Sequence, residues 1–365
     1  MSDIQQLYNA VDSDQNLYSD WNREDSLRAR PLFTVLWLVM LAVVVVMALR
    51  MIPNGFDGRK YIPVAVAFMP WMAGIAAIVL LCALVGRRRG LAAVCVVCCA
   101  IQVGWHWGYL RPADGAVADL PDTGTLTVNT GDRYARLMTL NTKNGLADAD
   151  QIVRAVREEH VEVLALQEVQ GTLLQRLERA GLTVLLPYSE IASVTNHDNG
   201  GVNALFTAAP MSSRTANLLP IESSNIPSGC VRFNLRTVCF GSVHPFSPRP
   251  RNQGLWNSSL DSISKLQSNT RLFVLLGDFN ATWDHASFRS LLGSRFVDAG
   301  ERNGAWFHMT YPSNAMLFCG RIAVPPLVEI DHIVHDRSIT VGDLETLDIA
   351  GSDHRALLGT LDVGR

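Results

Sequence analysis

Hydrophobic and polar residues divide the chain into two parts with different patterns. Three stretches without a charged side chain, residues 32–49, 62–85 and 91–110, occupy the first third of the sequence. Each is 18 residues or longer, enough for a helix to cross roughly 30 Å of hydrocarbon. We therefore expect three transmembrane helices within residues 32–110. The alternative, a buried three-helix soluble core, would require a polar face that these stretches lack.

Positive charges beside these stretches predict their orientation. The N-terminal flank and the GRRRG loop at residues 86–90 together carry six Arg, whereas the opposite side carries four Lys or Arg. Because Lys and Arg are enriched on the cytoplasmic side, we expect a multi-pass protein of the cell membrane with a cytoplasmic N-terminus. Everything after the third span is then extracytoplasmic. Trp105, Trp107 and Tyr109 fit an aromatic belt at the outer interface, and His106 fits an interface residue better than a ligand.

Two polar segments flank the apolar part. Residues 1–31 are acid-rich and lack periodicity, which is typical of a disordered tail, here on the cytoplasmic side. Residues 111–132 are rich in Pro, Gly, Asp and Thr and are interpreted as a linker. As a flexible coil its ends would lie ~25 Å apart, so the domain that follows stays near the bilayer.

From residue 133 to residue 365, short strand-like runs alternate with helix-like runs. "VEVLALQEV" and "RLFVLLGD" are typical of buried strands. Asp148 is suited to cap a helix that runs through Glu159, and Gly181 to end the next helix. The mixture predicts an α/β fold, a four-layer αββα sandwich with two mixed β-sheets face to face and helices outside.

Several predicted strands end in polar side chains of one small set. These are Asn141, Glu168, His244, Asp278, Asn280, Asp331, Asp353 and His354. Singly, each has a structural explanation, such as an Asx turn at Asp278. Together, Glu, Asp and Asn oxygens suit a hard divalent cation such as Mg²⁺ or Mn²⁺. Histidines beside such a cluster suit hydrolysis of a phosphate ester, which needs neutralised charge and an activated water.

The order of these motifs resembles the endonuclease/exonuclease/phosphatase superfamily, which is DNase I-like. "LALQEV", "GDFNAT" and "GSDHRAL" carry the resemblance, which covers roughly residues 133–365. With the three spans, the whole chain also resembles VanJ-type membrane-anchored phosphatases of actinobacteria, which are linked to undecaprenyl pyrophosphate dephosphorylation.

The superfamily resemblance implies a role for each matching residue. Glu168 would be the main metal ligand, with Asn141 close by and Asp353 assisting. Asp278 would orient or deprotonate the attacking water, and Asn280 would hold that water or a phosphate oxygen. The remaining implied roles belong to His354, which would stabilise phosphoryl charge, to Asp331, which would fix the His354 tautomer, and to His244, which would donate to the phosphate. One position departs from some nuclease members, because Lys143 stands where they carry a second acidic residue.

The seven cysteines fall into two groups. Four lie in the apolar stretches, where small packing residues are the expected interpretation. In "CVRFNLRTVC" two short strands would bring Cys230 and Cys239 face to face, either as a disulfide or as two free thiols. The pattern does not place Cys319.

Net charge limits the class of substrate. Residues 112–365 carry 27 Asp and Glu against 21 Lys and Arg, a net charge of −6. A protein that binds many backbone phosphates usually has a basic surface, so we expect no stable nucleic-acid complex. Binding of a small phosphate needs far less charge, and local cations such as Arg249 and Arg251, in the proline-rich loop after His244, could serve it.

The sequence therefore predicts a membrane-anchored phosphohydrolase acting at the outer membrane face. Its expected substrate is a lipid phosphate. The VanJ-type resemblance implies that this lipid is a polyprenyl pyrophosphate. Two alternatives remain open, an extracytoplasmic Mg²⁺-dependent nuclease and a non-catalytic binding or sensor module.

Overall fold

The computed structural model describes residues 31–112, 128–129, 131–195, 199–234, 236–304, 306–317 and 322–364. Within these residues the chain forms two compact units. The first comprises residues 31–47 and 71–102, and the second comprises residues 48–70 and 103–364. The predicted cytoplasmic tail, most of the predicted linker and Cys319 lie outside the described residues.

Three apolar helices supply the first unit. They are the helix Pro31–Arg50, α3 (Met69–Val85) and α4 (Arg89–Trp105). Met40 and Cys95 are buried, whereas large apolar side chains such as Leu38, Leu81 and Val97 are exposed. Cys98 is also buried, so at least two cysteines of this region act as packing residues, as predicted.

One helix among the described residues is long and apolar enough to cross a membrane. It is Pro31–Arg50, with 20 residues and a mean hydropathy of 2.9. Helices α3 and α4 are apolar but have 17 residues each. Of the three predicted spans, only the first corresponds to a helix of sufficient length among the described residues. The other two predicted spans are interrupted.

Both interruptions have a local cause. The predicted second span is divided at Phe68 into α2 (Ile62–Ala67) and α3. Pro70 has no N–H to bond to the carbonyl four residues earlier, so it cannot continue α2. The predicted third span is divided at His106 into α4 and α5 (Trp107–Leu110).

Residues around α5 pack within the second unit. His106 is buried, and its Nε2 lies 3.1 Å from both carboxylate oxygens of Asp284. Tyr109 is also buried, and its hydroxyl donates to Glu329 at 2.8 Å. The interpretation of these two residues as part of a membrane interface is therefore wrong, because their polar atoms bind buried carboxylates.

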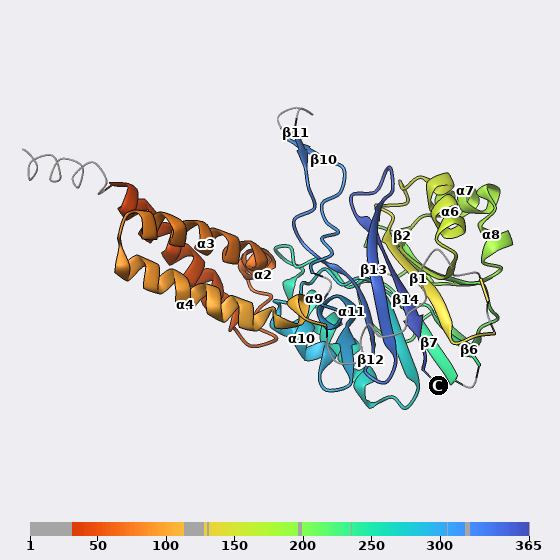
Figure 1. The fold of residues 1–365 in the computed structure, drawn as a ribbon. Coiled ribbons are helices and arrows are strands. Elements are labelled where there is room, and N and C mark those ends of the chain that lie inside the picture. Colours follow the sequence, from red (N-terminus) through yellow and green to blue (C-terminus); the bar gives the residue numbers. More distant parts are fainter. Residues whose placement is uncertain are drawn as a thin grey trace, which may run out of the picture. The chain divides into compact units, whose positions relative to one another are not determined.

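Two six-stranded mixed sheets form the rest of the second unit (Figure 1). The first has the order β13-β14-β1-β2-β4-β3, and the second has the order β5-β6-β7-β8-β12-β9. The first sheet contains β1 (Tyr134–Asn141), β2 (Val161–Val169), β3 (Tyr188–Ile191), β4 (Val202–Thr207), β13 (Thr340–Asp348) and β14 (Arg355–Asp362). The second contains β5 (Ser212–Thr215), β6 (Ser228–Phe233), β7 (Arg236–Val243), β8 (Leu272–Asp278), β9 (Phe296–Asp298) and β12 (Asp331–Asp336). A separate hairpin pairs β10 (Ala315–Leu317) with β11 (Ile322–Val324).

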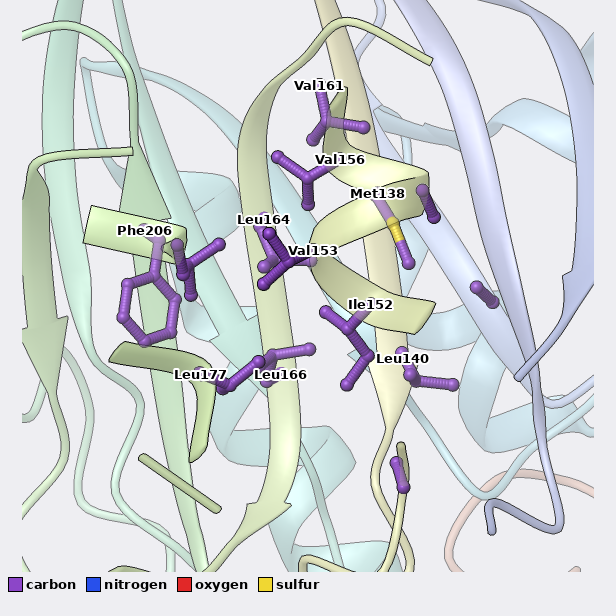
Figure 2. Packing of buried hydrophobic residues seen from close by; sticks show 14 of the residues in the cluster. Met138, Leu140, Ile152, Val153, Val156, Val161, Leu164, Leu166, Leu177 and Phe206 are labelled. Carbon is purple, nitrogen blue, oxygen red and sulfur yellow. The ribbon is translucent and has the colours of Figure 1, made fainter. Parts of the chain in front are cut away.

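Helices cover the outer faces of both sheets, which gives the predicted four layers. Figure 2 shows the packing of α6 (Ala149–Glu158) and α7 (Gly171–Ala180) against the first sheet, where Ile152 and Leu177 join the apolar cluster. The short α8 (Leu182–Leu185) belongs to the same layer. On the second sheet, the outer cluster contains residues of α9 (Gln253–Ser264) and α10 (Ala286–Leu292). The remaining helical segments are the 3₁₀ turn η2 (Lys265–Ser268) and α11 (Ala299–Arg302).

Local signals set the helix ends as the sequence predicts. Asp148 caps α6 by accepting from the Gln151 N–H at 3.0 Å. Gly181 ends α7 with a φ of 95°, a left-handed conformation that glycine adopts without steric cost.

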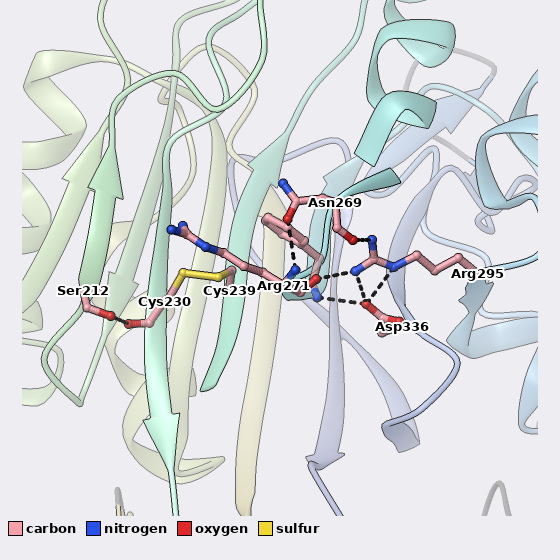
Figure 3. Close-up of a disulfide and its surroundings, with 8 residues drawn as sticks. Ser212, Cys230, Cys239, Asn269, Arg271, Arg295 and Asp336 are labelled. Carbon is pink, nitrogen blue, oxygen red and sulfur yellow. Dashed lines mark hydrogen bonds and ion pairs between the residues drawn. A yellow bond between two sulfur atoms is a disulfide. The ribbon is translucent and has the colours of Figure 1, made fainter. Parts of the chain in front are cut away.

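A disulfide links neighbouring strands of the second sheet. Cys230 of β6 and Cys239 of β7 are register partners and are joined by a disulfide (Figure 3). Further along this sheet, Arg295 anchors the chain before β9. Its guanidinium donates to Asp336 Oδ2 at 2.6 Å (Figure 3). It also donates to the Leu266 carbonyl at 2.7 Å. Of the two alternatives for the cysteine pair, the structure has the disulfide.

Candidate active site

Polar side chains replace apolar ones where the inner faces of several strands reach one edge of the sandwich. On β8, Val274 and Leu276 point into the core between the sheets, and the next residue in the same phase is Asp278. Parallel pairing brings the ends of β7 and β8 together, and antiparallel pairing brings the start of β12 to the same edge. The same edge therefore receives His244 directly after β7 and Asp331 at the start of β12. Asn141, the last residue of β1 in the facing sheet, meets them there through its hydrogen bond to Asp278.

Glu168 reaches this edge through a break in strand alternation. On β2 the core between the sheets includes Ala165, so regular alternation would turn residue 168 away from it. Glu168 instead has a φ of 56°, and the pairing with β4 shifts in register beside it. A bulge of this kind re-aims a side chain, and it brings Glu168 Oε1 to 3.1 Å from Asn141 Nδ2. Gly200 leaves the necessary room, because a Cβ there would lie 2.4 Å from Glu168 Cδ.

The amide of Asn141 lies between two carboxylates. Its Nδ2 donates to Glu168 Oε1 at 3.1 Å and to Asp278 Oδ2 at 3.0 Å. His244 Nε2 lies 3.7 Å from Glu168 Oε1 and 3.5 Å from Asp278 Oδ2. Because Asn199 Nδ2 donates to His244 Nδ1 at 3.2 Å, the proton of a neutral His244 is on Nε2, facing the carboxylates.

His354 bridges the two buried aspartates. Its Nδ1 lies 2.8 Å from Asp331 Oδ2, and its Nε2 lies 3.7 Å from Asp278 Oδ2. Burial opposes the imidazolium, but Asp331 and Asp278 outweigh burial and raise the pKa of His354 to about 10. Burial also opposes ionisation of Asp278, but His354 and His244 outweigh it and lower the pKa of Asp278 to about 2. At neutral pH an ionised carboxylate therefore faces an imidazolium.

The turn after β8 places Asn280 differently from an extended chain. Asn280 has a φ of 49°, and its N–H donates to Asp278 Oδ1 at 2.7 Å, which closes an Asx turn. Its side-chain amide donates to the Pro245 carbonyl at 3.1 Å. On an extended strand the side chains at positions 278 and 280 would point the same way and converge, but the Asx turn replaces that geometry. Both residues nevertheless line the same cleft.

A cleft of about 620 Å³ opens over these groups. The predicted residues that line it are Asn141, Glu168, His244, Arg249, Asp278, Asn280, Asp353 and His354. Asp331 is fully buried behind His354. Lys143 also lines the cleft and pairs with Asp353 at 3.7 Å, so it is placed to meet a phosphate as well as solvent.

Sequence reasoning missed several residues of the cleft. Asn199 holds His244, and the Tyr311 ring lies 4.9 Å from the His354 ring between centroids. Lys60, Tyr61 and Val64 also line the cleft, although they come from the segment around the start of α2. The Gly200-Gly201 pair signals an unusual backbone beside Asn199, but no motif marks the segment around α2.

The donor set of the cleft fits a divalent cation. Glu168 and Asp278 supply carboxylate oxygens that converge on Asn141, and oxygen ligands are those that Mg²⁺ prefers. Ligand atoms of Asp278, Asp331 and His354 also lie within 4.8 Å of one another. His354 is the weaker candidate ligand, because its raised pKa keeps both ring nitrogens protonated at neutral pH. We therefore place the fit for a metal at the carboxylates of Glu168 and Asp278, with the Asn141 amide close by.

Comparison with known proteins supports the fold and the order of the motifs. A model of the Endonuclease/Exonuclease/phosphatase family matches residues 138–354. Comparison with curated proteins gives no match, so the resemblance to VanJ-type proteins has no support there.

Two solved structures of TDP2, at 15% identity, show the likeness in fold. TDP2 of D. rerio complexed with single strand DNA product has 15% identity and a TM-score of 0.51, and the match covers 63% of this chain and 100% of that one. A humanized D. rerio TDP2 has 15% identity and a TM-score of 0.50, and the match covers 63% of this chain and 100% of that one. A family protein from Leptotrichia buccalis has 16% identity and a TM-score of 0.47, and the match covers 62% of this chain and 99% of that one.

Proposed function

The chain belongs to the Endonuclease/Exonuclease/phosphatase family, and from this premise we propose that it is a membrane-anchored, metal-dependent phosphohydrolase acting on a lipid phosphate. It is a hydrolase of phosphoric ester or anhydride bonds. The observation that carries the proposal is the position of Asp278, an ionised carboxylate on the cleft wall between Asn141, His244 and His354.

The residues around Asp278 divide the work of hydrolysis. A water oxygen forms a bond to phosphorus while the bond between phosphorus and the leaving oxygen breaks, and the electron pair departs with that oxygen. One proton of the water stays in the new P–OH group, and the other passes through solvent to the departing oxygen. Asp278 accepts a hydrogen bond from the water and orients it. With a pKa of about 2 it is a weak base, which suits a loose transition state that needs positioning more than early proton removal. His354 and His244 face the developing negative charge with N–H groups.

A bound divalent cation would be held by Glu168, with Asp278 and Asn141 beside it and Asp353 on the cleft wall. Mg²⁺ or Mn²⁺ there supplies charge neutralisation to the phosphoryl oxygens. Asp331 does not touch the cleft, but its bond to His354 Nδ1 keeps that imidazole cationic and oriented. Asn280 and Arg249 line the cleft as further contacts for phosphate oxygens.

Charge and the apolar helices support a lipid substrate over a nucleic acid. The net charge of −6 over residues 112–365 is unfavourable for binding many backbone phosphates, whereas one or two phosphates need only local cations. The helices of the first unit expose large apolar side chains, an arrangement that suits insertion in lipid. We propose that all three serve as the anchor and that a polyprenyl pyrophosphate is the substrate.

The disulfide supports a location outside the cytoplasm. Disulfides persist in oxidising compartments and are rare in the cytosol, and Cys230 and Cys239 are joined in the catalytic domain. The Arg-rich loop at residues 86–90 agrees with this orientation. A reporter fused to the C-terminus tests it: activity of a reporter that works only in the cytoplasm would reverse the assignment.

The substrate is tested with purified full-length protein in Mg²⁺ against polyprenyl pyrophosphate in bilayers, phospholipid bilayers and DNA. We expect phosphate release from the polyprenyl pyrophosphate and poor cleavage of DNA at physiological salt. Efficient DNA cleavage without phosphate release from lipid would instead establish the nuclease alternative. Binding without turnover of any substrate would establish the sensor alternative.

A further inference from the structure

The segment before and within α2 is fixed to the catalytic domain by buried polar contacts. Asp57 is buried and accepts from the Ser287 N–H at 2.8 Å and from the Ser287 hydroxyl at 2.6 Å. Asn257 Nδ2 donates to the same carboxylate at 3.0 Å. Residues 48–70 accordingly belong to the same compact unit as the two sheets. The segment is therefore part of the catalytic domain, although a long apolar helix precedes it.

A second attachment joins α2 to the loop that follows the Asp278 turn. His285 Nδ1 accepts from the Thr282 N–H at 2.8 Å, so the ring proton lies on Nε2. His285 Nε2 donates to the Pro63 carbonyl at 2.9 Å. His285 and Pro63 are both buried, so little solvent competes for these hydrogen bonds. The backbone of α2 is thereby fixed relative to the reacting groups.

Lys60 is held by its backbone while its side chain stays exposed. Its N–H donates to Gln253 Oε1 at 3.1 Å, and its carbonyl accepts from Gln253 Nε2. Lys60 has a φ of 50°, a left-handed conformation that turns the chain into α2. The ammonium group has no carboxylate partner among the residues that the structure describes, in contrast to Lys143, which pairs with Asp353. Lys60 is thus free to meet an anion.

The cleft wall formed by this segment combines one cation with apolar surface. Lys60, Tyr61 and Val64 line the cleft that also contains Asp278 and His354. Tyr61 is 77% exposed and Val64 is 56% exposed. Exposed apolar side chains beside a polar catalytic cleft gain free energy when an apolar ligand covers them. A substrate made of phosphate alone would leave Tyr61 and Val64 uncovered.

We propose that residues 60–64 form a substrate-binding wall for an amphiphilic phosphate ester. Lys60 binds an oxygen of the phosphate remote from the reaction, and Tyr61 and Val64 contact the first carbons of the apolar group attached to the phosphates. The inference rests on the proposed function and deepens it, because it names the residues that select a substrate with an apolar chain.

A binding measurement separates the wall from catalysis. Full-length protein in nanodiscs is titrated calorimetrically, in Mg²⁺, with the methyl and hexyl esters of methylenediphosphonate, which resist hydrolysis. We expect the wild type to bind the hexyl ester about tenfold more tightly than the methyl ester, because the extra carbons bury apolar surface. The double variant Tyr61→Ser, Val64→Ser should lose this preference. A matched control, Val184→Ser with Tyr188→Ser, changes exposed apolar residues outside the cleft and should keep it.

Lys60 is tested with the same two probes. Lys60→Ala should weaken binding of both esters by a similar factor of about five to ten, because the ammonium contacts the shared phosphonate groups. Lys265→Ala, an exposed lysine outside the cleft, should leave both affinities unchanged. Equal wild-type affinity for the two esters would contradict the proposed role of residues 60–64. A preference for the hexyl ester that survives the Tyr61 and Val64 substitutions would contradict it too. A preserved preference for the hexyl ester without hydrolysis of any diphosphate would support the wall and refute the proposed reaction.

Discussion

Asp278 of β8 and Asp331 of β12 are register partners on neighbouring antiparallel strands. Two like charges directly opposite each other destabilise a sheet. His354 resolves the conflict, since its Nδ1 lies 2.8 Å from Asp331 and its Nε2 lies 3.7 Å from Asp278. The pair of carboxylates keeps the His354 imidazole protonated, and the imidazolium helps to keep Asp278 ionised. Stability and chemistry at this edge of the sandwich therefore depend on the same three groups.

Removing the His354 imidazole should lower the rate of hydrolysis. We expect His354→Ala to lower kcat about 100-fold, because a cation facing the developing charge is lost. Asp331→Asn should lower kcat about tenfold, since it keeps the shape but lowers the pKa of His354. In a double-mutant cycle measured by kcat, the Asp331 change should have little further effect once His354 is absent. Independent, additive effects would contradict a role of Asp331 through His354.

Changing Glu168 should weaken metal dependence together with activity. Glu168→Gln keeps the size of the side chain and removes one negative charge from the group around Asn141. We expect the Mg²⁺ concentration for half-maximal activity to rise by tenfold or more, since hard cations bind charged oxygens best. Glu178→Gln, which changes an exposed glutamate of α7, is the matched control. An unchanged Mg²⁺ requirement in Glu168→Gln would place the metal elsewhere.

The disulfide should stabilise the domain without taking part in the reaction. Cys230 and Cys239 are nine positions apart in the sequence. Closing a loop of this length lowers the conformational entropy of the unfolded chain, which stabilises the folded protein by roughly 2–3 kcal/mol. Cys230→Ala with Cys239→Ala should lower the free energy of unfolding by this amount in urea titrations. Reductant should destabilise the wild type and leave the double variant unaffected. A reductant effect of equal size in both proteins would show that another group is responsible.

His335 predicts a pH dependence of stability away from the cleft. It is fully buried in β12, its Nδ1 donates to the Asp336 carbonyl at 2.9 Å, and burial lowers its pKa to about 4. The imidazole of His335 binds a proton near pH 6.5 in the unfolded chain but only near pH 4 in the folded chain. The contribution of neutral His335 to the free energy of unfolding is therefore complete above pH 6.5 and is lost as the pH falls toward 4.

The variant His335→Leu isolates that contribution. Between pH 7 and pH 5 the wild type should lose about 2 kcal/mol of unfolding free energy relative to His335→Leu. Urea titrations of both proteins at several pH values measure the difference. A constant difference between the two proteins over this range would show that His335 is protonated in the folded state.

Local patterns in the sequence were sufficient to predict the four layers of the fold and many residues of the candidate active site. The phase of "RLFVLLGD" places Asp278 after inward-facing Val274 and Leu276, because strand alternation is a property of the chain itself. Glu168 stands at the end of a similar run, but its direction depends on a bulge that the strand pattern does not encode. The residue was thus predictable, and the geometry that makes it useful was not.

Tertiary contacts explain what the sequence pattern missed. An apolar run in the sequence indicates that a helix would be stable in lipid, but it does not reveal partners elsewhere in the chain. His106 and Tyr109 bind buried carboxylates that are 178 and 220 residues away. Lys60 and Val64 likewise reach the cleft through contacts with α9 and with the loop around His285. No periodicity within residues 48–70 records those partners.

Phosphate release by the purified full-length protein tests the central claim most directly. Wild type, Asp278→Asn and the control Asp261→Asn, an exposed aspartate of α9, are assayed with polyprenyl pyrophosphate in bilayers, with Mg²⁺ and with EDTA. We predict release that needs the metal, a loss of about 100-fold or more in Asp278→Asn and no loss in Asp261→Asn. Near-normal release by a folded Asp278→Asn protein, or release that EDTA does not affect, would contradict the account.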